Sequence, residues 1–150
     1  MAKTTKGTGD FAVCKEAADQ FLAIAQKSKG ETCMDYLMTG FYPYAVNVAF
    51  ACELYLKAIM IIRSQSDEFD TGHNLKKLFN GLEIIDATYI ENEFQTQFSA
   101  KTLSEFLTDN GDVFINWRYA LEKAVAIDVT GFDVFADILK KYVHALASSN

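Results

Sequence analysis

The longest apolar segment of the chain, YAVNVAFACELYLKAIMII, runs from residue 44 to residue 62. Three polar residues interrupt it: Asn47, Glu53 and Lys57. A helix that is apolar on every side belongs in the interior of a protein. Pro43 stands where the first turn of a helix tolerates proline, and polar residues close the segment after about Ser66. The pattern therefore predicts a buried central helix. Its core side chains should include Val48, Ala51, Leu54, Ala58 and Ile61.

Apolar residues at three- and four-residue spacing predict helices along the rest of the chain. Asp10 is a good N-cap for a first helix that ends near Ser28, just before Gly30. Later helices are expected over about 73–82, 84–98 and 102–110, from Asp112 across Trp117 and Arg118, and from Thr130. No alternating strand pattern competes with them. We therefore expect an all-α, antiparallel up-and-down helical bundle that forms a single domain over residues 1–150.

The composition agrees with one helical domain outside a membrane. The chain has 150 residues, half of them hydrophobic, with twelve phenylalanines and one proline. Glu53 and Lys57 would each cost a few kcal/mol in lipid, and no apolar core of a signal peptide follows the first lysines. We therefore expect a cytoplasmic protein without membrane contact. The formal net charge of −6 disfavours strong non-specific binding to nucleic acid, which depends on phosphate neutralisation.

The sequence contains no recognisable metal or cofactor motif. Cys14, Cys33 and Cys52 have no CxxC spacing, so we expect reduced thiols. Two isolated histidines, without an HExxH motif or an EF-hand loop, give no metal ligand set. The chain also lacks a P-loop, a GxGxxG and a GxSxG motif. We therefore expect neither a bound metal nor a cofactor.

Two charge pairs at helical spacing are the main candidates for a polar site. Glu53 and Lys57 share one face of the central helix, and Arg118 and Glu122 share one face of a later helix. If those faces meet, the four charges can form a buried ion network that fixes the helix register. Alternatively, Arg118 grips an anion in a pocket where its neighbours Trp117 and Tyr119 supply stacking surface. Simple surface pairs are a third interpretation.

The two histidines have different surroundings. His73 follows Gly72 at a predicted helix start, where it can cap backbone N–H groups or hydrogen-bond a carboxylate of the central helix. It is also the best candidate for acid–base chemistry. His144 lies in the last turn of the last helix, where the helix dipole stabilises a cation. The candidate ligand or polar cluster is therefore Asn47, Glu53, Lys57, His73, Arg118, Tyr119 and Glu122.

Two neighbouring segments carry a family resemblance. FACELYLKAIM (residues 50–60), followed by TGHNLKKLF (71–79), resembles the HEPN superfamily. The resemblance covers residues 42–82 most directly, and NWRYALE (116–122) is similar to the late helix of some members. It implies an all-α up-and-down bundle that is often dimeric.

The same resemblance implies RNA chemistry, but the usual active site does not carry over. Many HEPN proteins are metal-independent ribonucleases in toxin–antitoxin, phage-defence and CRISPR systems. Their site resembles an Arg and a His with four to six residues between them, doubled across a dimer interface. Here nine residues separate Arg63 from His73, and Arg118 precedes no histidine until His144. The usual nuclease motif is therefore absent, and no catalytic residue is assigned.

The leading interpretation is a HEPN-like binding module, non-catalytic or divergent. It would act on RNA, a nucleotide or a partner protein in a prokaryotic defence or toxin–antitoxin setting. One alternative is a metal-independent ribonuclease with a rearranged site that uses His73 and Arg118. A second alternative is a structural helical scaffold. We also expect a homodimer, because the last helix offers more apolar surface than one bundle face needs, through Phe132, Phe135, Leu139 and Tyr142. Two copies of Arg118 would then line a shared cleft.

Overall fold

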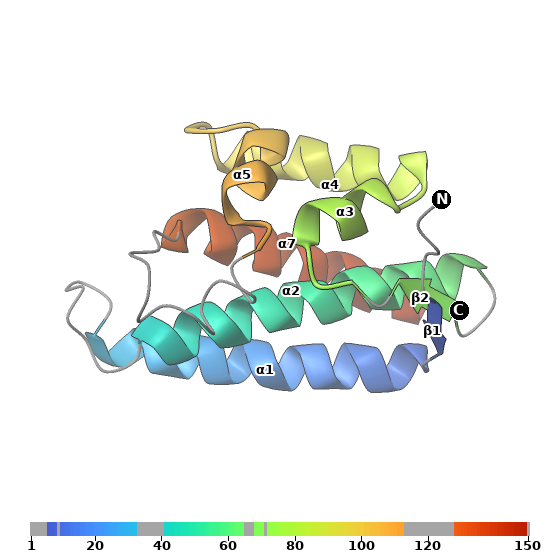
Figure 1. Ribbon diagram of the computed structural model, residues 1–150, viewed down its shortest axis with the longest axis horizontal. Helices are drawn as coiled ribbons and strands as arrows, with labels where there is room; N and C mark the ends of the chain where they lie inside the picture. Colours follow the sequence, from blue (N-terminus) through green and yellow to red (C-terminus); the bar gives the residue numbers. More distant parts are fainter. Residues whose placement is uncertain are drawn as a thin grey trace.

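The computed structural model describes residues 6–8, 10–32, 41–64, 68–70, 72–112 and 128–149. The described elements, in chain order, are β1 (Lys6–Thr8), α1 (Phe11–Thr32), α2 (Phe41–Ser64), β2 (Glu68–Asp70), α3 (Leu75–Asn80), α4 (Ile84–Gln97), α5 (Leu103–Asn110) and α7 (Val129–Ser148). Helices dominate, which confirms the predicted all-α bundle (Figure 1).

Helix α2 lies at the centre of the bundle. It packs along α1 and also contacts α7, α3 and β2. Figure 1 shows α1 running antiparallel to α2, whereas α7 runs parallel to α2 and antiparallel to α4. The bundle therefore has α1 on one side, α2 and α7 in the middle, and α3, α4 and α5 on the other side.

A small sheet at one end of the bundle was not expected. Strands β1 and β2 pair antiparallel, with Lys6 opposite Asp70 and Thr8 opposite Glu68. Each strand has three residues, KGT and EFD, and neither shows alternation of apolar and polar positions. Segments this short carry no periodic signal, so the sequence could not indicate the pairing.

The core side chains of α2 largely match the prediction. Val48, Ala51, Ala58 and Ile61 are buried, with at most 5% exposure. Leu54, also expected to be largely buried, is partly buried and packs against the edge of this core. Three residues spaced three and four apart, Asn47, Phe50 and Leu54, form a stripe of α2 that stays partly exposed. Helix α2 is therefore buried on most of its surface, but not on every side.

Several predicted helix ends differ from the observed ones, including those of α3, which spans Leu75–Asn80 and not 73–82. The Asp10 carboxylate caps α1 as expected, accepting from Ala12 N at 2.8 Å. However, α1 continues to Thr32 and includes Gly30, because a single glycine costs only about 1 kcal/mol in a helix. Helix α7 begins before Thr130, because the Asp128 carboxylate accepts from Gly131 N at 2.8 Å and sets the first turn.

Aromatic side chains of α4, α5 and α7 form a common core. The rings of Phe94, Phe106, Phe132 and Phe135 lie between 5.1 and 6.3 Å apart, centroid to centroid. Phe132, Phe135 and Leu139 are fully buried within one chain. The expectation that these three side chains form a surplus dimer surface is therefore wrong, because α7 packs them into its own bundle against α2, α4 and the Phe106 ring of α5.

The apolar character of α2 is explained by its position in the bundle. The segment Pro43–Ser64 is long and apolar enough to cross a membrane, judged by length and composition alone. However, 67% of its most apolar 18-residue stretch is buried inside the structure. Pro43 lies in the first turn of α2, as predicted. Cys14 and Cys52 are buried thiols without a disulfide, and Cys33 lies outside the described residues.

Candidate functional site

Three of the predicted site residues come together beside α2. The Lys57 Nζ lies 3.5 Å from Glu53 Oε2, one helical turn away, and His73 Nδ1 lies 2.6 Å from Glu53 Oε1. Glu53 and Lys57 are buried, whereas the His73 side chain is 47% exposed. We call these three residues the Glu53 cluster. The cluster joins the central helix to the loop before α3, and the His73 ring is its part that solvent reaches.

The loop that carries His73 is held in place by its neighbour, Asn74. The Asn74 Oδ1 caps α3 by accepting from Lys77 N at 3.0 Å, and its Nδ2 donates to Asp112 Oδ1 at 2.6 Å. Leu75 N also donates to Gly111 O at 3.0 Å. These bonds tie the start of α3 to the end of α5, so the position of His73 is set by three elements of the bundle.

The other predicted site residues do not join the Glu53 cluster among the described residues. Asn47 is partly buried, and its amide donates to Pro43 O at 2.7 Å within α2. Arg118, Tyr119 and Glu122 lie outside the described residues. The proposed contact between the Glu53–Lys57 face and the Arg118–Glu122 face therefore stays a prediction.

A second cluster, which the sequence interpretation missed, surrounds Asp86 on α4. The carboxylate is fully buried and accepts from Arg63 Nε and Nη at 2.8 to 3.1 Å. The Tyr142 hydroxyl of α7 also donates to it. The hydrogen bond to Asp86 raises the pKa of Arg63, and burial together with Asp86 raises the pKa of Tyr142. The sequence feature that could have indicated this cluster is the single carboxylate, Asp86, within the otherwise largely apolar segment IIDATYI.

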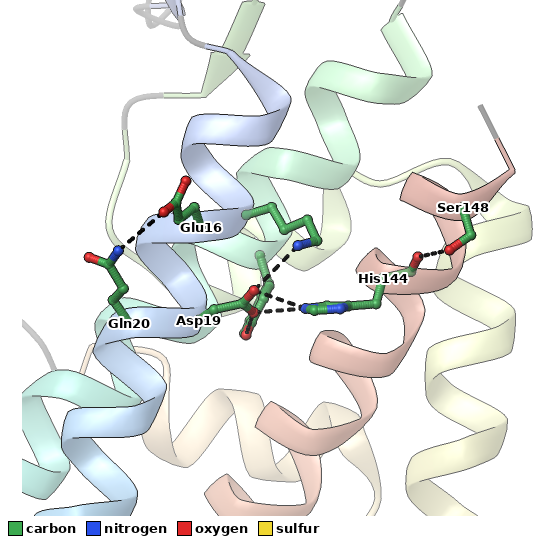
Figure 2. A network of polar contacts seen from close by, with 7 residues as sticks. Glu16, Asp19, Gln20, His144 and Ser148 are labelled. Carbon is green, nitrogen blue, oxygen red and sulfur yellow. Dashed lines mark hydrogen bonds and ion pairs between the residues drawn. The ribbon is translucent and has the colours of Figure 1, made fainter.

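A third cluster links α1, α2 and α7 through Asp19. Figure 2 shows the Asp19 carboxylate facing His144, whose Nε2 lies 2.9 Å from both carboxylate oxygens. The Tyr55 hydroxyl donates to Asp19 Oδ1 at 2.5 Å, and Lys15 Nζ lies 3.4 Å from Oδ2. His144 therefore has a specific carboxylate partner in addition to its position near a helix C-terminus.

The Asp19 cluster shifts the acidity of its members. Burial pushes the pKa of Asp19 upward, but hydrogen bonds from Tyr55 and His144 outweigh it and hold the pKa below the ordinary value. Burial and the bond to Asp19 raise the pKa of the Tyr55 phenol. Asp19 is thus kept ionised, and Tyr55 is kept neutral, at neutral pH.

An open groove of about 630 Å³ lies next to the Asp19 cluster. It is lined by Phe11, Ala12, Lys15, Glu16, Ile62 and Ala147. Its two charged side chains are engaged along α1, Lys15 with Asp19 and Glu16 with Gln20 at 3.5 Å. Figure 2 shows the Glu16–Gln20 contact on α1 and the Ser148–His144 hydrogen bond on α7. The groove therefore presents few polar groups to a ligand.

The first two turns of α4 expose large apolar side chains. Ile84, Ile85 and Tyr89 are 84%, 66% and 49% exposed. The Tyr89 ring stacks on Tyr142 with centroids 5.0 Å apart, so the exposed surface continues onto α7. We call Ile84, Ile85 and Tyr89 the α4 patch. Isoleucine is a mediocre helix former, so neither propensity nor burial explains its presence here.

The chemistry available to these groups is limited. Within the described ranges, no group of three or more His, Cys, Asp or Glu side chains could hold a metal ion. Each of the three clusters pairs a carboxylate with a side chain from another segment of the chain and so links parts of the bundle. Of the two described histidine–carboxylate pairs, the one in the Glu53 cluster has the more buried carboxylate, and a half-exposed ring that such a carboxylate orients is suited to acid–base work. Searches of protein-family models, curated proteins and solved structures found no match to this chain.

Proposed function

We propose that this chain is a HEPN-like helical binding module, non-catalytic or divergent, that holds a partner protein in a prokaryotic defence or toxin–antitoxin setting. The α4 patch carries the proposal. Ile84 and Ile85 are exposed to solvent, whereas most large aliphatic and aromatic side chains of α2, α5 and α7 are buried or partly buried. Contiguous apolar surface of this kind normally marks an interaction site. The HEPN-like part of the proposal rests on the sequence resemblance over residues 42–82.

Charge favours a protein partner over RNA or a nucleotide. Several basic side chains of the described residues pair with a carboxylate of the same chain: Lys15, Lys57, Arg63, Lys101 and Lys141. Phosphate binding depends on basic groups that are available to the ligand. The net charge of −6 further disfavours a polyanion. A partner protein is therefore the better match to this surface.

Affinity purification of the tagged chain from its host tests the proposal. We expect one protein to co-purify, to be identified by mass spectrometry, and to re-form the complex from purified components. An Ile84→Ser/Ile85→Ser variant should lose this complex, while His73→Ala should keep it. RNA as the bound species, with no reconstituted protein complex, would show that the function is different.

A rearranged ribonuclease is a second candidate, supported by one observation. The half-exposed His73 ring is hydrogen-bonded to the buried Glu53 carboxylate, which fixes the orientation of a potential general base. The candidate requires cleavage of total RNA in the presence of a chelator. It also requires that His73→Ala and Arg118→Ala abolish the cleavage. Equal cleavage by both variants and the wild type would attribute the activity to a contaminant.

The homodimer also stays a proposal, although not through the buried stripe of α7. Sedimentation at micromolar to tens of micromolar concentration tests it directly. A single monomeric species over that range would remove the dimer, and with it a cleft lined by two copies of Arg118.

A further inference from the structure

The α4 patch is a rigid surface rather than a loose helix end. Asp86 is the buried residue of the same turn and bonds to Arg63 of α2 and Tyr142 of α7. Tyr89 is stacked on Tyr142 as well. The exposed side chains of Ile85 and Tyr89 are four residues apart, so they lie next to each other on the helix. Because the patch is ordered before binding, a partner would lose little affinity to ordering it.

The surroundings of the patch are acidic. Between Lys77 and Lys101 the chain has no basic residue and four acidic ones: Glu83, Asp86, Glu91 and Glu93. Glu83 and Glu91 are exposed, while Asp86 is neutralised by Arg63. On α7, Lys141 pairs with Asp137 at 2.9 Å and also interacts with Glu93 of α4. The patch is thus an apolar surface with exposed carboxylates beside it.

This charge pattern discriminates between possible occupants. A second copy docked through the same patch would form a two-fold contact, which brings the acidic surroundings of one patch against the equally acidic surroundings of the other. Such like-charge contacts are costly. Anionic nucleic acid and anionic lipid surfaces are disfavoured for the same reason. A basic surface with an apolar stripe complements the patch in both respects.

We propose that Ile84, Ile85 and Tyr89 of α4 bind an amphipathic helix of a partner protein that carries Lys or Arg beside its apolar stripe. This inference rests on the proposed function and adds the chemical class of the partner. Apolar anchors at i, i+3 or i+4, and i+7 of such a helix would cover the isoleucines and the Tyr89 ring. Its basic side chains would lie against Glu83 and Glu91.

Fluorescence anisotropy with a set of synthetic helical peptides tests the proposal on the full chain. The peptides share one leucine stripe and differ only in the flanking residues, which are Lys, Gln or Glu. We expect the Lys peptide to bind most tightly, the Glu peptide at least about tenfold more weakly, and added salt to reduce the difference. Ile85→Ser should weaken the Lys peptide by about tenfold, as expected for one lost apolar anchor.

Ile24→Ser is the matched control, because Ile24 is an exposed isoleucine (49%) on α1, away from the patch. It should leave peptide binding unchanged. The proposal is overturned if no peptide of the set binds, if the Glu and Lys peptides bind alike, or if both isoleucine variants have the same effect. A concentration-dependent dimer that Ile85→Ser abolishes would identify a second copy as the occupant instead.

The failure of this inference can be separated from a failure of the proposed function. A reconstituted partner protein that binds Ile85→Ser as tightly as wild type would leave the binding module intact and remove the α4 patch from it. Absence of any protein complex, together with RNA cleavage that depends on His73, would remove the proposed function itself.

Discussion

Replacing the buried carboxylate of α4 should be one of the most damaging polar substitutions in this chain. Asp86 has no exposure and accepts hydrogen bonds from Arg63 and Tyr142, so Asp86→Ala leaves both donors without their acceptor. Breaking a buried ion pair costs about 3–5 kcal/mol. The Arg63 side chain is 33% exposed, so water recovers part of its hydration. We therefore expect a loss of about 3 kcal/mol, or roughly 6–12 °C in Tm.

Urea unfolding followed by far-UV circular dichroism measures this loss. The matched control is Asp109→Ala, which breaks the exposed pair of Lys101 Nζ and Asp109 Oδ2 at 3.1 Å and should cost less than about 1 kcal/mol. A double variant, Arg63→Met/Asp86→Leu, removes both charges and should regain most of the stability lost by Asp86→Ala. The reasoning is refuted if Asp86→Ala costs no more than Asp109→Ala, or if the double variant is no more stable than the single one.

Three further predictions concern the core and the acid stability of the bundle. Leu56→Ala should cost about 2–5 kcal/mol because Leu56 is fully buried, and the partly buried Leu54 should cost clearly less when replaced by alanine; equal losses in urea unfolding would contradict the burial pattern. Gly131→Ala should lower Tm, because its Cβ would lie 2.6 Å from the Phe106 ring; an unchanged or higher Tm would disagree with this close approach. The lowered pKa of Asp19 adds stability that is complete above the ordinary Asp value of about 3.9 and is lost as pH falls below it. Asp19→Asn should therefore lose less stability than wild type between about pH 5 and pH 2, and identical acid profiles would refute this.

The fold could be predicted because its signals are long or local. The 19-residue apolar run 44–62 could belong only to a central helix, and Asp10 and Thr102 cap their helices as the sequence indicates. Local signals do not predict helix ends where one residue fits two roles or two residues fit the same role. Gly30 can end a helix or lie inside one, and Thr130 competes with Asp128 for the N-cap. The packing of the whole helix decides such cases, and propensity does not.

The polar clusters could be predicted only where the two partners lie on the same helix or in neighbouring segments of the sequence. Glu53 and Lys57 lie one turn apart on one helix, so their pairing follows from helical geometry. A hydrogen bond from His73 to a carboxylate of the central helix was one of the open interpretations, and Glu53 is that carboxylate. The Asp19–His144 pair joins residues 125 positions apart. Nothing in one sequence indicates which helix faces meet over that separation, so this pair could not be found.

The position of α7 beside α2 has a consequence for synthesis on the ribosome. Helices α1 and α2 are consecutive and can form a helical hairpin early, but the α7 residues that cover Tyr44 and bond to Asp19 are made after the other described helices. Until then, the apolar side of α2 that α7 covers is open to water and to other chains. Nascent chains that stall before Val129 should therefore be prone to aggregation and dependent on chaperones, whereas chains that include α7 can close the core.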